Sequence, residues 1–388
     1  MTGARFDLAT ATEIRFGAGR AAQLPGIVAT LGAARVLLVT GATATRAEPV
    51  RAALAATGVA VAAYPVGGEP TVEAIRQGIA AACEHGAEAV LGLGGGSALD
   101  AAKAIAALAD HGTDPMEHLE VVGAGRPLTR PGLPCLAVPT TAGTGSEVTR
   151  NAVLSVGALK ASLRSPTLLP RVALVDPDLL VGAPPATVAA SGSDALSQLV
   201  EPYLSLRANP VTDALALAGI RRSARSLARA GRDGLDDDPP GREDLALASL
   251  LGGLCLANAG LGAVHGLAAV LGARYAAPHG AVCAALLGPV VEGNLAALRA
   301  RDSAHPILAR FADLAAALTG RPDATADEAG RWLADLRIGL GVPGLGGYGM
   351  GEADLPELVA QARLASSMQA NPVQLTDDEL ADILRRAS

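Results

Sequence analysis

The stretch EAVLGLGGGSALDAAK, residues Glu88 to Lys103, decides the fold of this chain. An apolar run from Ala89 to Leu93 has the length of a buried strand, and the helical pattern ALDAAKAIAAL follows Ser97. Three glycines between them, Gly94 to Gly96, let backbone N–H groups turn toward one point, where the next helix also favours an anion. We predict a diphosphate-binding turn here, and a plain strand–helix turn that packs tightly through glycine is the alternative.

Strand and helix patterns alternate upstream of this turn. They cover residues 35–40 (strand), 41–56 (helix), 59–64 (strand) and 72–84 (helix). This βαβα order predicts a doubly wound parallel sheet, which binds ligands at the carboxyl ends of its strands. Beyond about Val181 helical patterns prevail. We therefore expect an α/β dinucleotide-binding domain over residues 1–182 and an all-helical domain over residues 183–388.

Composition narrows the function classes. A chain of 388 residues is long enough for two domains, and its formal charge of −7 without a basic run argues against a nucleic-acid partner. The N-terminus has charges and no long apolar region, so we expect no signal peptide. Four scattered cysteines without a C-x-x-C pair predict reduced core thiols in a cytoplasmic protein: Cys83, Cys135, Cys255 and Cys283.

One segment imitates a membrane span. Residues 245–273 contain no Asp, Glu, Lys or Arg and are long enough to cross a bilayer. Asn258, His265 and several glycines interrupt the apolar pattern, and flanking Trp or Lys belts are missing. We expect a helix or helix pair buried on all sides, and no membrane partner.

A second polar motif follows another strand pattern. Residues 136–149, LAVPTTAGTGSEVT, end a strand in a loop rich in hydroxyls and glycine. Hydroxyls and free amides at the end of a strand suit a nucleotide or a substrate oxygen. A Thr/Ser turn with capping roles is the alternative.

A third group of polar residues lies in the helical half. Asp194 and Gln198 are four residues apart and share a helix face, with Glu201 nearby. Together with His265 and His279 they offer a ligand shell for Zn²⁺ or Fe²⁺. From spacing alone, core histidines hydrogen-bonded to a carboxylate are the favoured interpretation of the pattern.

Four motifs in one order cover nearly the whole chain: GGGSALDAAK, PTTAGTGSEVT, SDALSQLVEPYLSLRANPVTDALA and VHGLAAVLGARYAAPHG. They resemble those of the iron-containing (group III) alcohol dehydrogenases, whose architecture is shared with dehydroquinate synthase. The resemblance implies a dinucleotide-binding α/β domain, a helical domain and an active site in the cleft between them. It also implies hydride transfer between NAD(P)H and a carbonyl polarised by a divalent metal, and a homo-oligomer of two or more chains.

The resemblance also assigns residues. It places Gly95, Gly96, Ser97 and Asp100 at the phosphate turn, Thr140, Thr141 and Thr144 along the cofactor and substrate, and Lys160 near the cofactor ribose. It places the metal at Asp194, Gln198, His265 and His279, and the two histidines are also the candidate catalytic groups.

Three positions depart from the family pattern. Gln198 replaces a histidine ligand, so the metal is expected to be weaker, different or absent. Ala269 stands where many members have a second histidine for proton relay, so water or a ribose hydroxyl would relay the proton. Gly41 replaces an Asp that contacts the adenosine ribose, which permits NADPH, and Arg46 is either its partner or a solvated helix residue.

These observations favour a cytoplasmic NAD(P)-dependent dehydrogenase acting on a small aldehyde, ketone or alcohol. One alternative is a maleylacetate reductase-type enzyme, whose dianionic substrate would need cations. The basic residues near the motifs are Arg150, Lys160, Arg164 and Arg274. A second alternative, of another class, is a nucleotide-binding protein that has lost catalysis.

Overall fold

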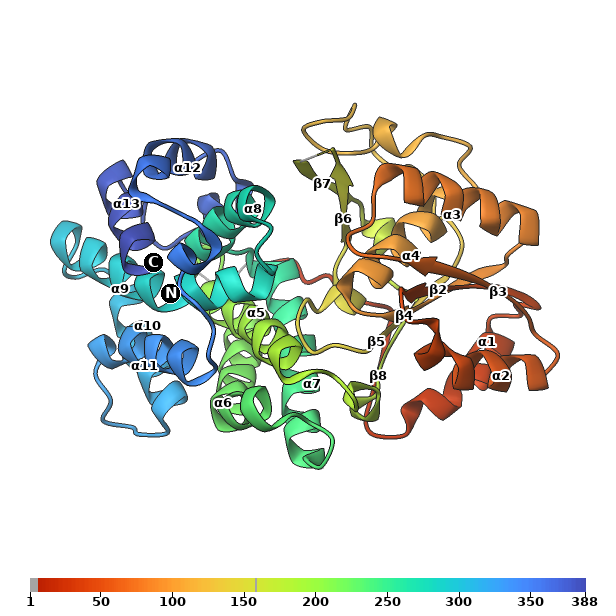
Figure 1. Cartoon of the computed structure of the whole chain (residues 1–388), viewed down its shortest axis with the longest axis horizontal. Coiled ribbons are helices and arrows are strands. Elements are labelled where there is room, and N and C mark those ends of the chain that lie inside the picture. The colour runs from red at the N-terminus through yellow and green to blue at the C-terminus, as the bar shows by residue number, and fades with distance from the viewer. Residues whose placement is uncertain (1–5, 158) are drawn as a thin grey trace. The chain divides into compact units, whose positions relative to one another are not determined.

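Six parallel strands form the sheet of the first compact unit, in the order β1-β8-β5-β4-β2-β3 (Figure 1). The computed structural model describes residues 6–157 and 159–388. The sheet strands are β1 (Glu13–Phe16), β2 (Arg35–Gly41), β3 (Ala60–Val66), β4 (Ala89–Gly94), β5 (Cys135–Pro139) and β8 (Val172–Val175). The predicted doubly wound parallel sheet is confirmed.

The order of the strands reverses beside β2. The chain passes from β2 outward to β3 and then returns to β4 on the other side of β2. Open α/β sheets bind ligands at such a reversal, beyond the carboxyl ends of the strands. The glycine turn that follows β4 lies at this point.

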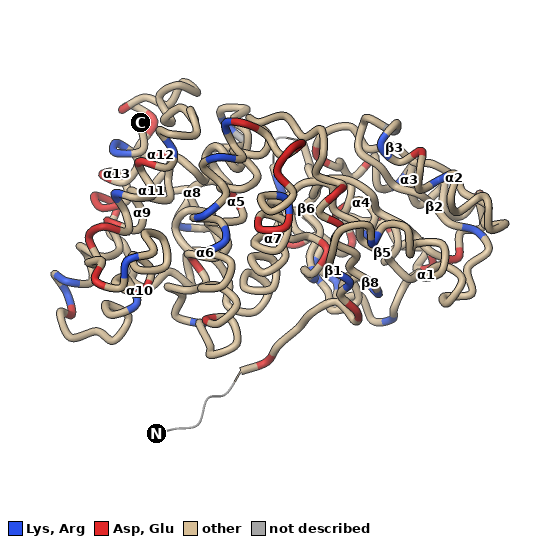
Figure 2. Tube along the Cα trace, turned by 90° about the horizontal axis from the view of Figure 1, so that it is seen from below, with Lys and Arg blue, Asp and Glu red and all other residues tan. Residues whose placement is uncertain are grey.

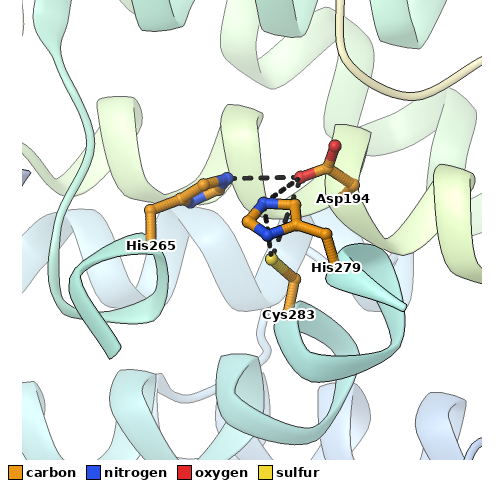
Figure 3. Close-up of side chains that lie close together, drawn as sticks. All are labelled: Asp194, His265, His279 and Cys283. Carbon is orange, nitrogen blue, oxygen red and sulfur yellow. Dashed lines mark hydrogen bonds and ion pairs between the residues drawn. The ribbon is translucent and has the colours of Figure 1, made fainter. Parts of the chain in front are cut away.

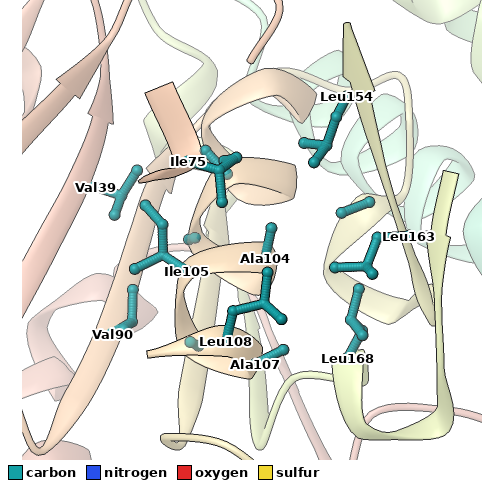
Figure 4. Close-up of a cluster of buried hydrophobic side chains, with 14 of the residues drawn as sticks. Val39, Ile75, Val90, Ala104, Ile105, Ala107, Leu108, Leu154, Leu163 and Leu168 are labelled. Carbon is teal, nitrogen blue, oxygen red and sulfur yellow. The ribbon is translucent and has the colours of Figure 1, made fainter. Parts of the chain in front are cut away.

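The helix after the glycine turn lies inside this unit. The helices here are α1 (Leu24–Thr30), α2 (Glu48–Ala56), α3 (Val72–His85) and α4 (Gly96–Leu108). Figure 4 shows α4 between the sheet and the antiparallel hairpin of β6 (Asn151–Val156) and β7 (Leu159–Arg164). Ile105 faces Val90 of β4, while Leu154 and Leu163 come from the hairpin. Cover on both sides explains why the α4 sequence is almost wholly apolar.

Helices make up the second unit. They are α5 (Pro185–Leu204), α6 (Pro210–Asp233), α7 (Pro239–Ala259), α8 (Ala263–Tyr275), α9 (His279–Arg301), α10 (Ile307–Thr319), α11 (Ala326–Gly339), α12 (Leu355–Ala362) and α13 (Asp377–Arg386). This unit contains residues 182–388 with residues 142–144, and the α/β unit contains residues 9–141 and 145–181. The expected helical second half is confirmed, and whether 1–182 and 183–388 fold as independent domains stays a prediction.

The long uncharged segment is a bent pair of helices. α7 and α8 meet at a bend of 104° in this segment, as the predicted helix pair requires. α9 is also long and apolar enough to cross a membrane, but 78% of its most apolar window is buried inside the protein, as in a core helix. Figure 2 shows acidic and basic residues interspersed along both units in the described chain.

Candidate active site

Three of the predicted metal ligands converge within the helical unit. Asp194 lies in the buried middle of α5, His265 in the first turn of α8, and His279 is the first residue of α9 (Figure 3). The His265 Nε2 atom is 3.2 Å from Asp194 Oδ1, and the His279 Nε2 atom is 3.7 Å from the same oxygen. Core histidines hydrogen-bonded to a carboxylate, the alternative interpretation, would also bring His265 to Asp194. The second ring on the same oxygen supports the metal site, which stays a prediction.

Cys283 is a fourth possible metal donor in this group, and it was not predicted from the sequence. The Cys283 Sγ atom is 3.6 Å from His279 Nε2 and 3.8 Å from Asp194 Oδ1. One ligand atom from each of Asp194, His265, His279 and Cys283 lies within 4.8 Å of all the others. We had interpreted all four cysteines as core thiols. All four are free, but Cys83 is exposed, and buried Cys283 belongs to this cluster.

Glu201 orients His265 from the side away from Asp194. Its Oε2 atom is 2.5 Å from His265 Nδ1, and its Oε1 atom accepts a hydrogen bond of 2.7 Å from the Val264 backbone N–H. A carboxylate behind an imidazole fixes the tautomer with the proton on Nδ1 and leaves the Nε2 lone pair for a metal. Glu201 is buried on the same face of α5 as Asp194.

The two buried carboxylates, Asp194 and Glu201, shift the pKa values of the other groups in this cluster. Burial alone would lower the pKa of His265, but Glu201 and Asp194 outweigh it and raise that pKa to about 10. Burial alone would raise the pKa of Asp194, but the hydrogen bond with His265 and the charge of His279 hold it below its ordinary value. Burial, with the charges of Asp194 and Glu201, raises the pKa of the Cys283 thiol. These carboxylates favour positive charge, so a divalent cation fits the donors present.

Gln198 lies one helical turn after Asp194 and is also buried. Its side chain lies near the Asp194 carboxylate and contributes to the lowered pKa of that group. Its Oε1 atom is buried and has no hydrogen-bond partner among the described residues. The structure therefore places Gln198 beside the cluster, and its predicted part as a ligand stays a prediction.

The start of α9 is fixed by a close approach to α5. A Cβ atom on Gly280 would lie 2.0 Å from the carbonyl oxygen of Ala190, so only glycine fits there. This contact holds His279 and Cys283, which are one turn apart on α9, against the face of α5 that carries Asp194. Histidine and cysteine at i and i+4 was the sequence signal that we did not use.

The glycine turn of the α/β unit has the form expected of an anion site. α4 begins at Gly96, and Gly95 is its N-cap without a side-chain cap. Ser97, which the helical pattern from Ala98 leaves outside the helix, lies inside its first turn, because the helix begins two residues earlier than that pattern predicts. Gly41 ends β2 beside this turn, since a Cβ on Gly94 would lie 3.2 Å from the Gly41 backbone nitrogen.

Asp100 lies in the second turn of α4 and is already neutralised within the protein. Its Oδ1 atom is 3.1 Å from the fully buried ammonium group of Lys103, and it accepts a hydrogen bond of 2.5 Å from the Ser146 hydroxyl. Its Oδ2 atom accepts a hydrogen bond of 2.9 Å from the Val153 backbone N–H. A bound diphosphate would therefore meet a paired carboxylate, and Asp100 holds the loop and hairpin to α4.

The predicted threonines lie around the loop after β5. The Thr140 backbone N–H donates a hydrogen bond of 2.9 Å to the Gly94 carbonyl, and the Thr141 side chain lies beside Gly95. Both belong to the α/β unit, whereas Thr144 belongs to the short segment grouped with the helical unit. Thr140 and Thr141 therefore border the glycine turn, and their contact with a cofactor stays a prediction.

Three of the four cations that a dianionic substrate would use are paired. Lys160 contacts Glu69, Arg164 contacts Glu120, and Arg274 contacts both Asp354 and Glu357. Within residues 6–157 and 159–388, Arg150 forms no ion pair. These pairs weigh against the maleylacetate reductase-type alternative. The position of the missing relay histidine, Ala269, is an exposed residue one turn after His265 on α8.

Comparison with known proteins places both units of this chain in one protein family. The family model described as iron-containing alcohol dehydrogenase matches residues 11–177, and the model for the C-terminal part of that family matches residues 188–388. Long-chain-alcohol dehydrogenase 1 of Geobacillus thermodenitrificans is 37% identical over 386 residues, 96% of this chain and 94% of that protein. The 1,3-propanediol dehydrogenase of Klebsiella pneumoniae is 38% identical over 323 residues, 81% of this chain and 79% of that protein.

Solved structures agree. The crystal structure of a 1,3-propanediol oxidoreductase superimposes with a TM-score of 0.90 at 34% identity and covers 99% of this chain and 100% of that chain. A sulfoacetaldehyde reductase from Bifidobacterium kashiwanohense, solved in complex with NAD⁺, has a TM-score of 0.87 at 27% identity, with coverage of 99% and 98%. The chain belongs to the iron-containing alcohol dehydrogenase family and is an NAD(P)-dependent oxidoreductase.

Proposed function

We propose that this enzyme transfers a hydride between a nicotinamide cofactor and a small aldehyde or ketone held beside Asp194, His265 and His279. The convergence of both imidazoles on one Asp194 oxygen carries the proposal, at 3.2 and 3.7 Å. A divalent metal, Fe²⁺ or Zn²⁺, when bound by these residues, would polarise the carbonyl as a Lewis acid. Glu201 keeps the His265 Nε2 atom aimed at that point through its hydrogen bond with Nδ1.

The glycine turn is the proposed binding site for the diphosphate of the cofactor. Gly95 and Gly96 start α4, so the free amides of its first turn point away from the helix toward an anion. Gly41 ends β2 where a carboxylate would repel a 2′-phosphate, and no acidic residue follows until Glu48. We therefore expect the enzyme to accept both NADH and NADPH.

The hydroxyl proton of the alcohol needs a relay to water, and Ala269 stands where many family members have a histidine for this task. His265 and His279 touch Asp194 and are the nearest ionisable rings, and His279 is partly exposed while His265 is buried. We propose that water or a ribose hydroxyl of the cofactor exchanges the proton with the substrate oxygen when a metal occupies the Nε2 atoms of His265 and His279, while His265 Nδ1 is held by Glu201. Without metal, the same two rings would serve as hydrogen-bond donors to the carbonyl.

The substrate class follows the relatives, which act on long-chain alcohols and 1,3-propanediol according to their names. We propose an uncharged aldehyde, ketone or alcohol, because Lys160, Arg164 and Arg274 already pair with carboxylates. We propose that the enzyme works in the cytoplasm, in agreement with its four free thiols. We also propose that it forms a homo-oligomer, as the family resemblance implies.

The test combines metal analysis with turnover. Protein purified without chelator is analysed for bound metal, and NADH and NADPH oxidation is measured on a series of short and long aldehydes. We expect bound zinc or iron, activity lost on chelation and restored by metal, and loss of both metal and activity in Asp194→Asn. Metal-free protein with full turnover would contradict the metal, and cofactor binding without turnover on any carbonyl would favour the lapsed nucleotide-binding protein.

A further inference from the structure

We infer that Cys283, rather than Gln198, supplies the fourth protein ligand of the metal site. The inference rests on the proposed metal at Asp194, His265 and His279. It assigns a thiolate to a shell that would otherwise hold only oxygen and nitrogen. It also gives Gln198 a different part, as a hydrogen-bond donor that positions Asp194.

The distances between the donor atoms support this shell. Around a tetrahedral zinc ion, neighbouring donor atoms are about 3.3 Å apart for nitrogen and oxygen and about 3.6 Å apart when one is sulfur, given the usual metal–ligand lengths. The Cys283 Sγ atom is 3.6 Å from His279 Nε2 and 3.8 Å from Asp194 Oδ1. His265 Nε2 is 3.2 Å from the same oxygen. With 3.7 Å between His279 Nε2 and Asp194 Oδ1, four of the six distances between donors lie within about 0.4 Å of those around a tetrahedral ion, and all six are within 4.8 Å (Figure 3).

The backbone holds the thiol in this place. His279 and Cys283 are one turn apart on α9, and Gly280 fixes that turn against Ala190 of α5. The Cys283 side chain is fully buried, so it has no solvent-facing alternative position. A buried thiol in contact with a carboxylate and an imidazole lies where a metal ligand would lie.

Gln198 is oriented differently. Its amide helps to hold the pKa of Asp194 below its ordinary value, as a donor does beside a carboxylate that has no proton to give, so we infer that the amide nitrogen faces Asp194. The Oε1 atom is then directed elsewhere, and it is buried without a partner. Turning the amide over would set two oxygens against each other unless a cation lay between them. A Gln198 ligand therefore needs a rearrangement that a Cys283 ligand does not need.

A thiolate changes which metal the site selects. Soft sulfur favours zinc over manganese and magnesium, and two anionic ligands, Asp194 and Cys283, balance the charge of a divalent ion. We expect the wild-type protein to hold Zn²⁺ against a chelator more firmly than a variant with an oxygen donor at residue 283.

The experiment loads the full-length protein with Co²⁺, because a cysteine thiolate bound to Co²⁺ produces an intense charge-transfer absorption in the near ultraviolet that oxygen and nitrogen ligands do not. Wild type, Cys283→Ser, Gln198→Ala and Asp194→Asn are compared, with Zn²⁺ affinity measured by chelator competition. We expect the absorption in wild type and Gln198→Ala and its loss in Cys283→Ser. Zn²⁺ affinity should fall about 10–100-fold in Gln198→Ala, the loss typical of residues behind the ligands, and by more in Cys283→Ser, which loses a ligand itself.

The outcomes separate this inference from the proposed function. Co²⁺ that binds wild type but not Asp194→Asn, without the thiolate absorption, overturns the Cys283 assignment and leaves the metal site standing. An absorption that survives in Cys283→Ser overturns it as well. Failure of wild type to bind Co²⁺ or Zn²⁺ overturns both. The test stays decisive if Cys283→Ser does not fold, because wild type, Gln198→Ala and Asp194→Asn alone show whether Co²⁺ bound at this site carries the thiolate absorption.

Discussion

Two buried groups of charged residues, one in each unit, differ in whether the protein itself completes them. In the α/β unit, the fully buried Lys103 ammonium donates to the Ser146 and Asn151 carbonyls, at 3.0 and 2.5 Å, and to the Thr149 hydroxyl, at 3.0 Å. The Asp100 carboxylate lies beside it. In the helical unit, Asp194 and Glu201 face imidazoles and a thiol, and neither carboxylate pairs with a lysine or arginine among the residues that the structure describes.

The difference separates a structural cluster from a functional one. The Asp100 carboxylate balances the charge of Lys103, and all three protons of the ammonium group have acceptors. This cluster therefore needs no bound ion. The Asp194 cluster collects donor atoms that suit a metal and leaves one amide oxygen, Gln198 Oε1, without a partner. Loss of a residue from the first cluster should therefore weaken folding, and loss of a residue from the second should weaken metal binding.

The strongest way to break this comparison is Lys103→Met. Removing the ammonium leaves Asp100 and three buried acceptors without their partner, and such losses cost about 3–5 kcal/mol of unfolding free energy. Urea unfolding followed by circular dichroism measures the loss. Arg51→Met removes an exposed pair with Glu48 in the same unit and should cost less than about 1 kcal/mol. Equal losses in the two variants would show that the buried cluster is not structural.

Glu147 sharpens the structural side through pH. It is buried near Lys103, and burial raises its pKa to about 7, offset in part by its own backbone amide and by Lys103. A folded pKa above the unfolded value means that the native state binds the proton more tightly, so stability falls as pH rises from about 4.5 to 7.

The variant Glu147→Gln removes this dependence. At pH 5 it should match the wild type closely, and at pH 8 it should be more stable, by up to about 3 kcal/mol for a shift of this size. Urea unfolding at both pH values measures the gap. Parallel pH profiles for wild type and variant would show that Glu147 does not titrate in this range.

How far the sequence predicts each region depends on how local its pattern is. The strand, glycine turn and helix from Ala89 to Leu108 could be predicted because their periodicity lies within one stretch of chain. Asp194 and Gln198 could be placed on one face for the same reason. The helix start was missed by two residues because Gly95 caps α4 without a side chain, and the hairpin β6–β7 was not predicted.

The parts that could not be predicted depend on contacts between distant segments. Lys103 is buried because Ser146 and Asn151, more than 40 residues later, bring their carbonyls to it. Cys283 has no C-x-x-C partner, and its spacing from His279 gains meaning only when α9 is known to begin at His279. Close approach of helices, as at Gly280 and Ala190, then decides which side chains meet.

In the Asp194 cluster, Glu201→Gln tests whether Glu201 orients the His265 ring, without removing a proposed metal ligand. The amide can still accept from the Val264 N–H but cannot accept the His265 Nδ1 proton as a carboxylate does. Loss of a carboxylate behind a metal-binding histidine lowers metal affinity about 10–100-fold. Chelator competition with Zn²⁺ measures the metal affinity. The control is Glu357→Gln, at an exposed position of α12. Unchanged affinity in Glu201→Gln would remove Glu201 from the metal site.

The smallest expected effect is at the glycine turn, where one helix carries both kinds of region. α4 buries Lys103 along its length and opens its first turn at Gly95. A Cβ on Gly95 would meet only the Thr141 side chain, at 3.4 and 3.5 Å, which is ordinary contact, so Gly95→Ala should fold normally. The added methyl group would still lie where we expect the diphosphate to approach the backbone.

We therefore expect Gly95→Ala to weaken NADH binding about five- to tenfold, the equivalent of about 1–1.4 kcal/mol, because backbone amides lose their close approach to the phosphates. Quenching or enhancement of NADH fluorescence on titration measures the affinity, and urea unfolding checks that stability is unchanged. Gly26→Ala in α1, where a Cβ meets no atom within 4 Å, is the matched control and should leave NADH affinity unaltered. Normal NADH affinity in a stable Gly95→Ala variant would mean that this turn is only a tight connection between strand and helix. The α/β unit would then have a closed structural cluster and no anion site beside it, and the cofactor would have to be held elsewhere.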